Sequence, residues 1–178
     1  GVNQALIYYY FKSKEELFSE LINANVNELI SAKNNAIGEK DIFGRHVIRE
    51  VIDKMLDTLR EKEKVFSIMM GELYRNSHRK NYEAVFGAFM PAIRGGKEKL
   101  LALGADRKDI DREIIAGIFF GSVPMITYAT LGEKLTDYYG IDKESLDKIF
   151  TEFIYRFSED YVEFLKNRMK VSSYQDLL

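Results

Sequence analysis

Residues Gly1 to Leu17 have the sequence GVNQALIYYYFKSKEEL, and two helix starts lie within this stretch. The first is at Asn3, whose side chain can cap a short helix. Val2 before the cap and Ile7 inside the helix have the spacing of a hydrophobic staple, which fixes how the chain enters the helix. The stretch therefore predicts a short helix over residues 4–11.

The second helix start is the capping box Ser13-Lys14-Glu15-Glu16. In a capping box the serine hydroxyl accepts the amide of Glu16, while the Glu16 side chain reaches back to the serine N–H. Apolar residues then recur at helical spacing as far as Gly38. The same spacing predicts further helices over 42–60, 63–74, 81–103 and 106–135, and a last one that begins after the N-cap Asp142. We find no convincing period-2 strand, so the predicted fold class is all-α.

Composition narrows the function classes. The chain has 178 residues, of which 46% are hydrophobic and 30% charged, the mixture of an ordinary globular protein. A net charge of −2 leaves no chain-wide basic field for nucleic acid or an anionic membrane, so any such contact must be local. Lys12 and Lys14 make residues 1–14 such a local basic spot, because no acid occurs there. The absence of cysteine suits a reducing compartment, and we expect a soluble, cytoplasmic protein without membrane contact.

Signals for enzymatic chemistry are poor. His46 and His78 are far apart in the sequence and have no histidine at i+4, which argues against a histidine metal cluster. Arg94-Gly95-Gly96-Lys97 lacks the leading glycine, the strand and the Ser/Thr of a phosphate loop. We therefore expect neither an enzyme nor a bound metal or cofactor.

The predicted helix over residues 4–11 has a buried stripe of Ile7 and Phe11 and a polar, tyrosine-rich outer face, which is the form of the second helix of a helix-turn-helix. With glycine and valine before it and Lys-Ser-Lys and an acidic pair after it, the segment resembles the DNA-binding motif of the TetR (tetracycline-repressor) family of bacterial transcriptional regulators. The resemblance covers about a tenth of the chain. It implies that the chain begins within the motif. It also implies that residues 1–22 are the C-terminal part of the DNA-binding domain and residues 23–178 a larger helical ligand-binding and dimerisation bundle.

The resemblance assigns DNA contacts to seven residues. It places Gln4, Ala5 and Tyr9 at base edges in the major groove, and Leu6, Tyr8, Tyr10 and Lys14 toward phosphates or thymine methyls. The chemistry agrees, because glutamine can pair with adenine and alanine can touch a thymine methyl, while tyrosine hydroxyls and lysine suit phosphates. Taken without the resemblance, the run Tyr8-Tyr9-Tyr10-Phe11 is more often a set of core or interface aromatics than a DNA-binding surface.

The resemblance further implies a small hydrophobic effector held between helices of the larger domain. Flexible methionine and flat aromatic side chains suit such a site. The candidates are Phe66, Met69, Met70, Tyr74, Phe89, Met90, Phe120, Met125 and Tyr128. The alternative is that these residues are simply core. Pro91 and Pro124 are expected to kink their helices, which would make room for a ligand.

A homodimer on a palindromic operator is the last implication, with the final two helices of each copy forming a four-helix bundle. The interface candidates are Gly117, Gly121, Phe153, Phe157, Tyr161 and Phe164. The glycine pair would let a partner approach closely, or else marks a tight contact within the chain. Two other functions remain open: a DNA-binding architectural or division-control protein of the same fold without an effector, and an all-α enzyme or lipid or small-molecule carrier.

Overall fold

The computed structural model describes residues 9–41, 43–75, 79–102 and 104–169. Within these ranges the chain forms helices and no strand, which confirms the all-α prediction. Tyr9 and Tyr10 are helical, and the chain then breaks at residues 11–13. The elements that follow are α2 (Lys14–Ile37), α3 (Arg45–Glu61), α4 (Glu63–Tyr74), α5 (Arg79–Ala102), α6 (Arg107–Ala116), the π-helix η1 (Gly117–Ser122), α7 (Val123–Tyr139) and α8 (Lys143–Met169).

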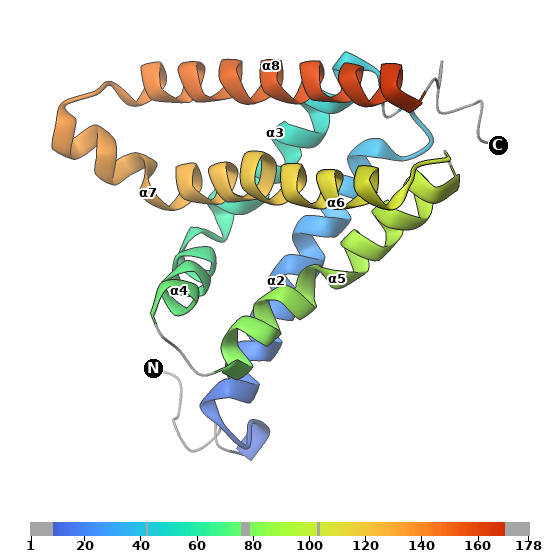
Figure 1. Cartoon of the computed structure of the whole chain (residues 1–178). Coiled ribbons are helices and arrows are strands. Elements are labelled where there is room, and N and C mark those ends of the chain that lie inside the picture. The colour runs from blue at the N-terminus through green and yellow to red at the C-terminus, as the bar shows by residue number, and fades with distance from the viewer. Residues whose placement is uncertain (1–8, 42, 76–78, 103, 170–178) are drawn as a thin grey trace.

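The helices are arranged in two directions (Figure 1). The long helices α2 and α5 pack against each other and against α3 and α4. The elements α6, η1 and α7 form one continuous rod that crosses this group, and α8 runs back along the rod. The N-terminal end of α2 therefore lies at one extreme of the molecule, and α8 lies at the opposite extreme.

The start of α2 is capped as predicted in one respect and differs in another. Ser13 Oγ accepts the backbone N–H of Glu16 at 3.1 Å. The reciprocal bond to Ser13 is not formed, however, because the Glu16 carboxylate accepts the N–H of Lys12 instead, at 2.6 Å. Ser13 has an extended backbone, and its carbonyl accepts Leu17. The segment before α2 is thus tied to the first turn of α2 through Lys12.

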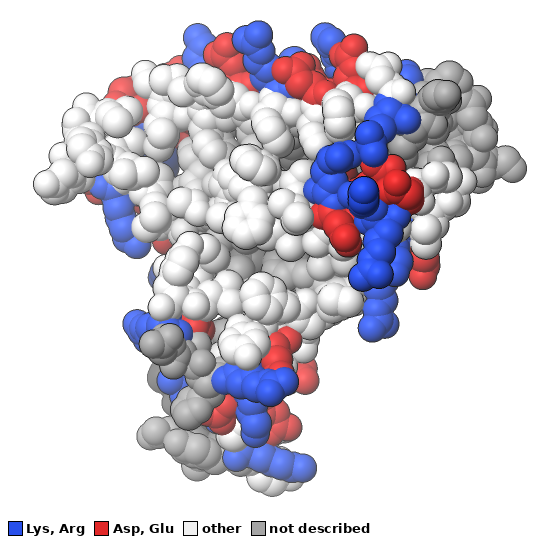
Figure 2. Space-filling model, in the orientation of Figure 1, with Lys and Arg blue, Asp and Glu red and all other residues white. Residues whose placement is uncertain are grey.

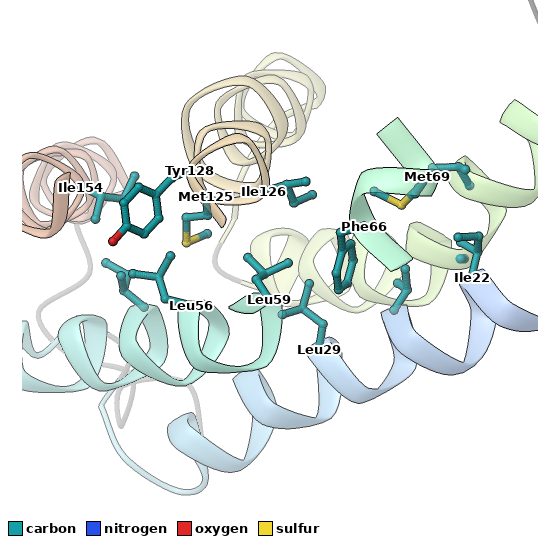
Figure 3. Close-up of a cluster of buried hydrophobic side chains, with 14 of the residues drawn as sticks. Ile22, Leu29, Leu56, Leu59, Phe66, Met69, Met125, Ile126, Tyr128 and Ile154 are labelled. Atoms are coloured by element: carbon teal, nitrogen blue, oxygen red, sulfur yellow. The ribbon is translucent and has the colours of Figure 1, made fainter. Parts of the chain in front are cut away.

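The core lies where α2, α3, α4, α5, α7 and α8 meet (Figure 3). Among the described side chains, Phe66, Ile22, Leu56 and Leu59 are almost fully removed from solvent. Each such side chain stabilises the fold by roughly 1.5–3 kcal/mol relative to leaving it exposed. Because α2 supplies residues along most of its length to this cluster, the position of α2 is set by the core.

A π-helical turn interrupts the rod of α6 and α7 just before Pro124. Proline has no N–H, so the carbonyl of Phe120 loses its usual donor four residues later. The chain instead makes a wider turn, in which Val123 donates to Ile118 five residues back. The expected single helix over 106–135 is therefore three segments, and it extends to Tyr139. Pro91, by contrast, lies inside α5, which is continuous through it.

Helix α8 is attached to α3 largely through polar contacts. Only Ile154 and Leu165 of its described residues are buried and apolar. A row of ion pairs and hydrogen bonds runs along the two helices, and we call it the α3–α8 ladder: Arg45–Glu163, Arg49–Glu159, Asp53–Tyr155 and Arg60–Asp147. Its best-formed ion pair joins Arg49 Nε to Glu159 Oε1 at 2.6 Å. The docking of α8 is therefore more polar than the packing of α2.

Candidate nucleic-acid interface and adjoining surfaces

The amino end presents the described DNA-binding candidates to solvent. Tyr9 is 81% exposed and Tyr10 is 70% exposed, and their rings meet edge to face at 5.2 Å. Lys14 is also exposed. The alternative that these two tyrosines belong to the core is therefore wrong. The other four candidates, Gln4, Ala5, Leu6 and Tyr8, lie outside the described residues.

The charges around these tyrosines suit an anionic partner. Lys12 and Lys14 are exposed on either side of the Ser13 cap. The first turn of α2 carries Glu15 and Glu16, but the Glu16 carboxylate is engaged by the Lys12 amide. Free backbone amides at a helix N-terminus also favour negative groups. The segment at the start of α2 thus offers two exposed cations and two exposed hydroxyl-bearing rings, with Glu15 and Glu16 following in the first turn.

The nine effector candidates divide by burial into three groups. Core positions are occupied by Phe66, Met69, Met125 and Tyr128 (Figure 3). Two others, Met70 and Phe89, are partly buried against that core. The remaining three, Tyr74, Met90 and Phe120, are exposed. The set therefore does not line one common surface, and the core interpretation accounts for its buried members.

An open groove lies between α6, η1 and the second half of α8. Its volume is about 570 Å³. Phe120, Phe157 and Tyr161 form one side, with ring centroids 5.5 Å apart for the first pair and 6.1 Å for the second. Lys108, Asp111, Arg112, Ile115 and Ala116 complete the lining, and we call this feature the aromatic groove. Phe120 is the one effector candidate that it contains.

A second, polar pocket of about 460 Å³ lies among the ends of α3, α7 and α8. At its base Arg60 donates to the Tyr128 hydroxyl at 2.7 Å, and that hydroxyl donates to Asp147. Burial and the bond to Asp147 together raise the pKa of Tyr128. Sequence reasoning missed this network, because its three members are far apart in the chain and Tyr128 had been assigned to an apolar pocket.

The dimer candidates on α8 face outward. Phe153 is 71% exposed, and Phe157 and Phe164 are 40% and 47% exposed, whereas Tyr161 is partly buried. A Cβ placed at Gly117 or Gly121 would meet no described atom within 4 Å. The alternative of a tight contact within the chain at these glycines is therefore wrong.

Further exposed apolar residues extend this surface onto the rod of α6 and η1. Sequence reasoning missed three of them, Ile115, Phe119 and Ile149, which share the helical spacing of core residues and cannot be told from them by period. We call the combined surface the apolar face, and it consists of Ile115, Phe119, Phe120, Ile149, Phe153, Phe157 and Phe164. Figure 2 shows a broad area free of charged side chains over α6, η1, α7 and α8.

The same rod has a composition that bears on membranes. Among the described residues, the helix Arg107–Tyr139 is long and apolar enough to cross a bilayer by length and composition. Part of its apolar surface packs into the core through Met125 and Ile126. Of the most apolar stretch of this helix, 28% is buried inside the protein.

A partly buried residue, Glu113, has its carboxylate beside Tyr161, which lines the aromatic groove. Glu113 Oε2 and the Tyr161 hydroxyl are shielded from solvent, and neither forms a hydrogen bond of standard geometry with a described residue. Burial raises the pKa of Glu113, and the neighbouring Tyr161 hydroxyl and Lys33 ammonium oppose that rise. Burial and the charge of Glu113 likewise raise the pKa of Tyr161. This cluster links α2, α6 and α8.

Comparison with known proteins gives one match. Residues 1–21 match the family model for bacterial regulatory proteins of the tetR family. No curated protein and no solved structure matches the chain. The match supports tetR-family membership and a DNA-binding helix-turn-helix regulator of transcription, and the all-α architecture is consistent with a TetR-like fold. Tyr9, Tyr10 and Lys14 all lie inside the matched segment.

Proposed function

We propose that the chain belongs to a ligand-responsive repressor that binds a palindromic operator as a homodimer and releases it when a small apolar or amphipathic molecule binds the larger domain. The observation that carries the proposal is the outward exposure of Tyr9, Tyr10 and Lys14 inside the segment that matches the tetR-family model. Base contacts by Gln4, Ala5 and Tyr9 would specify the operator, and phosphate contacts by Lys14 and the other tyrosines would fix the register.

The apolar face supports the homodimer. Monomeric proteins rarely leave this many large apolar side chains together in solvent. A self-complementary interface of two such faces would bury them around a two-fold axis, and Gly117 and Gly121 leave room for close approach. We call the segment of each copy that carries Tyr9, Tyr10 and Lys14 its reading end. Two reading ends about 34 Å apart would then reach successive major grooves on one side of the duplex.

The switch requires no chemistry in this proposal. An effector that binds better to a conformer with wrongly spaced reading ends shifts the population toward that conformer, and its differential affinity sets the size of the effect. Helix α2 joins the reading end to the core, so a rearrangement around Phe66 or Met69 would move the reading end.

The test is salt-dependent DNA binding by the full-length protein, with the operator selected from a random duplex library. Replacing Lys14 with alanine should weaken binding to every sequence and lower the slope of log affinity against log salt by about 1. Replacing Tyr9 with alanine should relax sequence preference, with a loss of about 1–3 kcal/mol at one position. The matched control is Lys64→Ala, an exposed lysine on α4. Unchanged affinity in the Tyr9 and Lys14 double variant would contradict the proposal.

A second candidate is a DNA-binding protein of the same fold that has no effector. The full burial of Phe66, Met69 and Met125 favours it, since these candidate lining residues are packed together. Thermal unfolding in the presence of a panel of apolar compounds separates the two candidates. A ligand that raises Tm and also lowers operator affinity supports the repressor, whereas DNA binding without any such ligand supports the second candidate.

A further inference from the structure

The two ends of the apolar face are unlike. At the end formed by the turn from α7 to α8, Tyr138 and Tyr139 are 83% and 67% exposed and meet edge to face at 5.0 Å. Ile141 beside them is also exposed. We call these three residues the aromatic tip. It projects at one end of the molecule, and the described residues of the same chain do not cover it (Figure 1).

The other end of the face carries the aromatic groove. Lys108 and Arg112 line it, and the Arg112 guanidinium lies over the Phe164 ring at 5.8 Å. Arg112 is paired with Asp109, which also holds Arg168, and Asp111 is part of the lining. Lys108 is therefore the lining cation that forms no ion pair with a described residue. Figure 2 shows positive and negative side chains together on this flank of the uncharged area.

Near the aromatic tip, exposed carboxylates outnumber the exposed ammonium of Lys134. Asp137, Asp142 and Glu144 are exposed around it. The nearby Lys143 ammonium is neutralised by Glu133, at 2.7 Å. Exposed carboxylates therefore surround the aromatic tip, and Lys108 lies in the aromatic groove at the other end of the apolar face. An opposite-charge contact between the two ends is thus available to a pair of copies.

Symmetry brings these unlike ends together. If two copies pair through the apolar face and both reading ends face one duplex, the two-fold axis runs from α8 toward the N-terminal end of α2. A rotation about that axis exchanges the two ends of the face, because the rod and α8 run across it (Figure 1). The aromatic tip of one copy then lies opposite the aromatic groove of the other.

We propose that Tyr138 and Tyr139 of one copy insert into the aromatic groove of the second copy, so that each groove is completed by its partner. The inference rests on the homodimer proposed above and specifies its register. Aromatic rings filling a pocket at an interface bury about 150–250 Å² each. Pairing of Asp137 with the partner's Lys108 would add steering and orientation.

Cysteine cross-linking of the full chain tests the register. The chain has no cysteine, so a Tyr139→Cys, Lys108→Cys double variant carries one designed pair. Both positions lie on the continuous helix Arg107–Tyr139, about 45 Å apart at 1.5 Å per residue, so a disulfide between them must join two copies. We expect covalent dimers from the double variant on mild oxidation. We expect far fewer from either single variant or from Tyr139→Cys with Lys14→Cys.

Light scattering at the same protein concentration distinguishes between two negative results of the cross-linking experiment. Absence of any dimer overturns the homodimer and this register together. A non-covalent dimer that does not cross-link overturns only the register. As a second measure, Asp137→Lys and Lys108→Glu should each raise the dimer dissociation constant several-fold, and their combination should restore it. If the double variant dimerises no more tightly than the single variants, the proposed pairing is overturned. The same result is expected if a small amphipathic ligand occupies the groove instead.

Discussion

Ser13 and Glu16 tie the segment of Tyr9 and Tyr10 to α2 through two local hydrogen bonds, of 3.1 Å and 2.6 Å. Ser13 caps α2, and Glu16 holds the backbone of Lys12. Both residues are exposed, so their value lies in fixing the chain direction between Tyr10 and α2 and not in burying surface.

Replacing Ser13 with alanine should therefore cost stability and DNA affinity together. Loss of an N-cap costs about 1 kcal/mol, which corresponds to a fall in Tm of roughly 2–4 °C for a chain of this size. Ser13→Thr keeps an acceptor oxygen and is the matched control, which calorimetry should place near the wild type. If the alanine variant had the stability and operator affinity of the threonine variant, the cap would have no role.

Glu113 should make the protein less stable as the pH rises. Because burial raises its pKa in the folded state, the folded protein binds this proton more tightly than the unfolded chain does. The contribution is therefore fully present below pH 4.5, the ordinary value, and is lost as the pH rises through the folded pKa.

The variant Glu113→Gln removes that titration, so its Tm relative to the wild type should increase between pH 4 and 8. The rise should be about 2–4 °C for each kcal/mol recovered. Glu98→Gln, an exposed position on α5, controls for the loss of a negative charge. Parallel Tm curves for Glu113→Gln and the wild type across this range would show that the buried carboxyl does not titrate as described.

At the scale of an element, α8 shows which features of a helix its sequence periodicity predicts. The apolar stripe predicted on it is present, but it divides between two surfaces. Ile154 is 6% exposed, whereas its neighbour Phe153 is 71% exposed. A 3.6-residue period marks both as apolar positions, and only the packing of α3 and α7 decides which one enters the core. The sequence therefore predicts the helix and not the division of its surface.

The helix ends were predictable because capping depends on neighbouring residues. The π-helix was not predictable in this way. The capping side chains of Ser13 and Asp142 act within three residues, and both accept the expected amides. Gly140 ends α7 with a positive φ of 64°, a backbone conformation that glycine adopts freely. The π-helical turn at η1 depends instead on which carbonyls accept hydrogen bonds around Pro124. Residue types alone do not determine that choice.

The α3–α8 ladder should govern how firmly α8 is held. Arg49→Glu or Glu159→Arg places like charges across the two helices and should speed amide hydrogen exchange throughout α8 while leaving α2 protected. Combining the two reversals restores an opposite pair and should restore protection. Salt should mimic the single variants, because surface ion pairs are screened. Equal exchange in all variants would mean that Ile154 and Leu165 alone hold the helix.

At the scale of the whole molecule, the proposed pairing of apolar faces would couple the stability of the fold to self-association. Dimer formation stabilises a fold by mass action, so Tm should rise with protein concentration. Phe153→Asp puts a charge where the monomer is exposed, which costs the monomer little. The same charge would be buried in a dimer, which is strongly unfavourable.

We therefore expect Phe153→Asp to remain folded but monomeric, with a Tm independent of concentration and with weakened operator binding. Phe153→Leu is the control, and it should dimerise. Light scattering and circular dichroism check the two statements separately. A stable Phe153→Asp dimer would place the interface elsewhere on the molecule.

The length of α2 determines how far a small tilt of the helix displaces its N-terminal end. Its 24 residues extend about 36 Å, with the core at one side and the Lys12–Glu16 bond at the tip. If the segment held by that bond moves with the helix, tilting α2 by about 5° sweeps its end through about 3 Å, close to the rise of one base pair. In the proposed dimer, two copies tilting in opposite senses would double this displacement, so a small tilt of α2 would be enough to misalign the proposed contacts with the duplex.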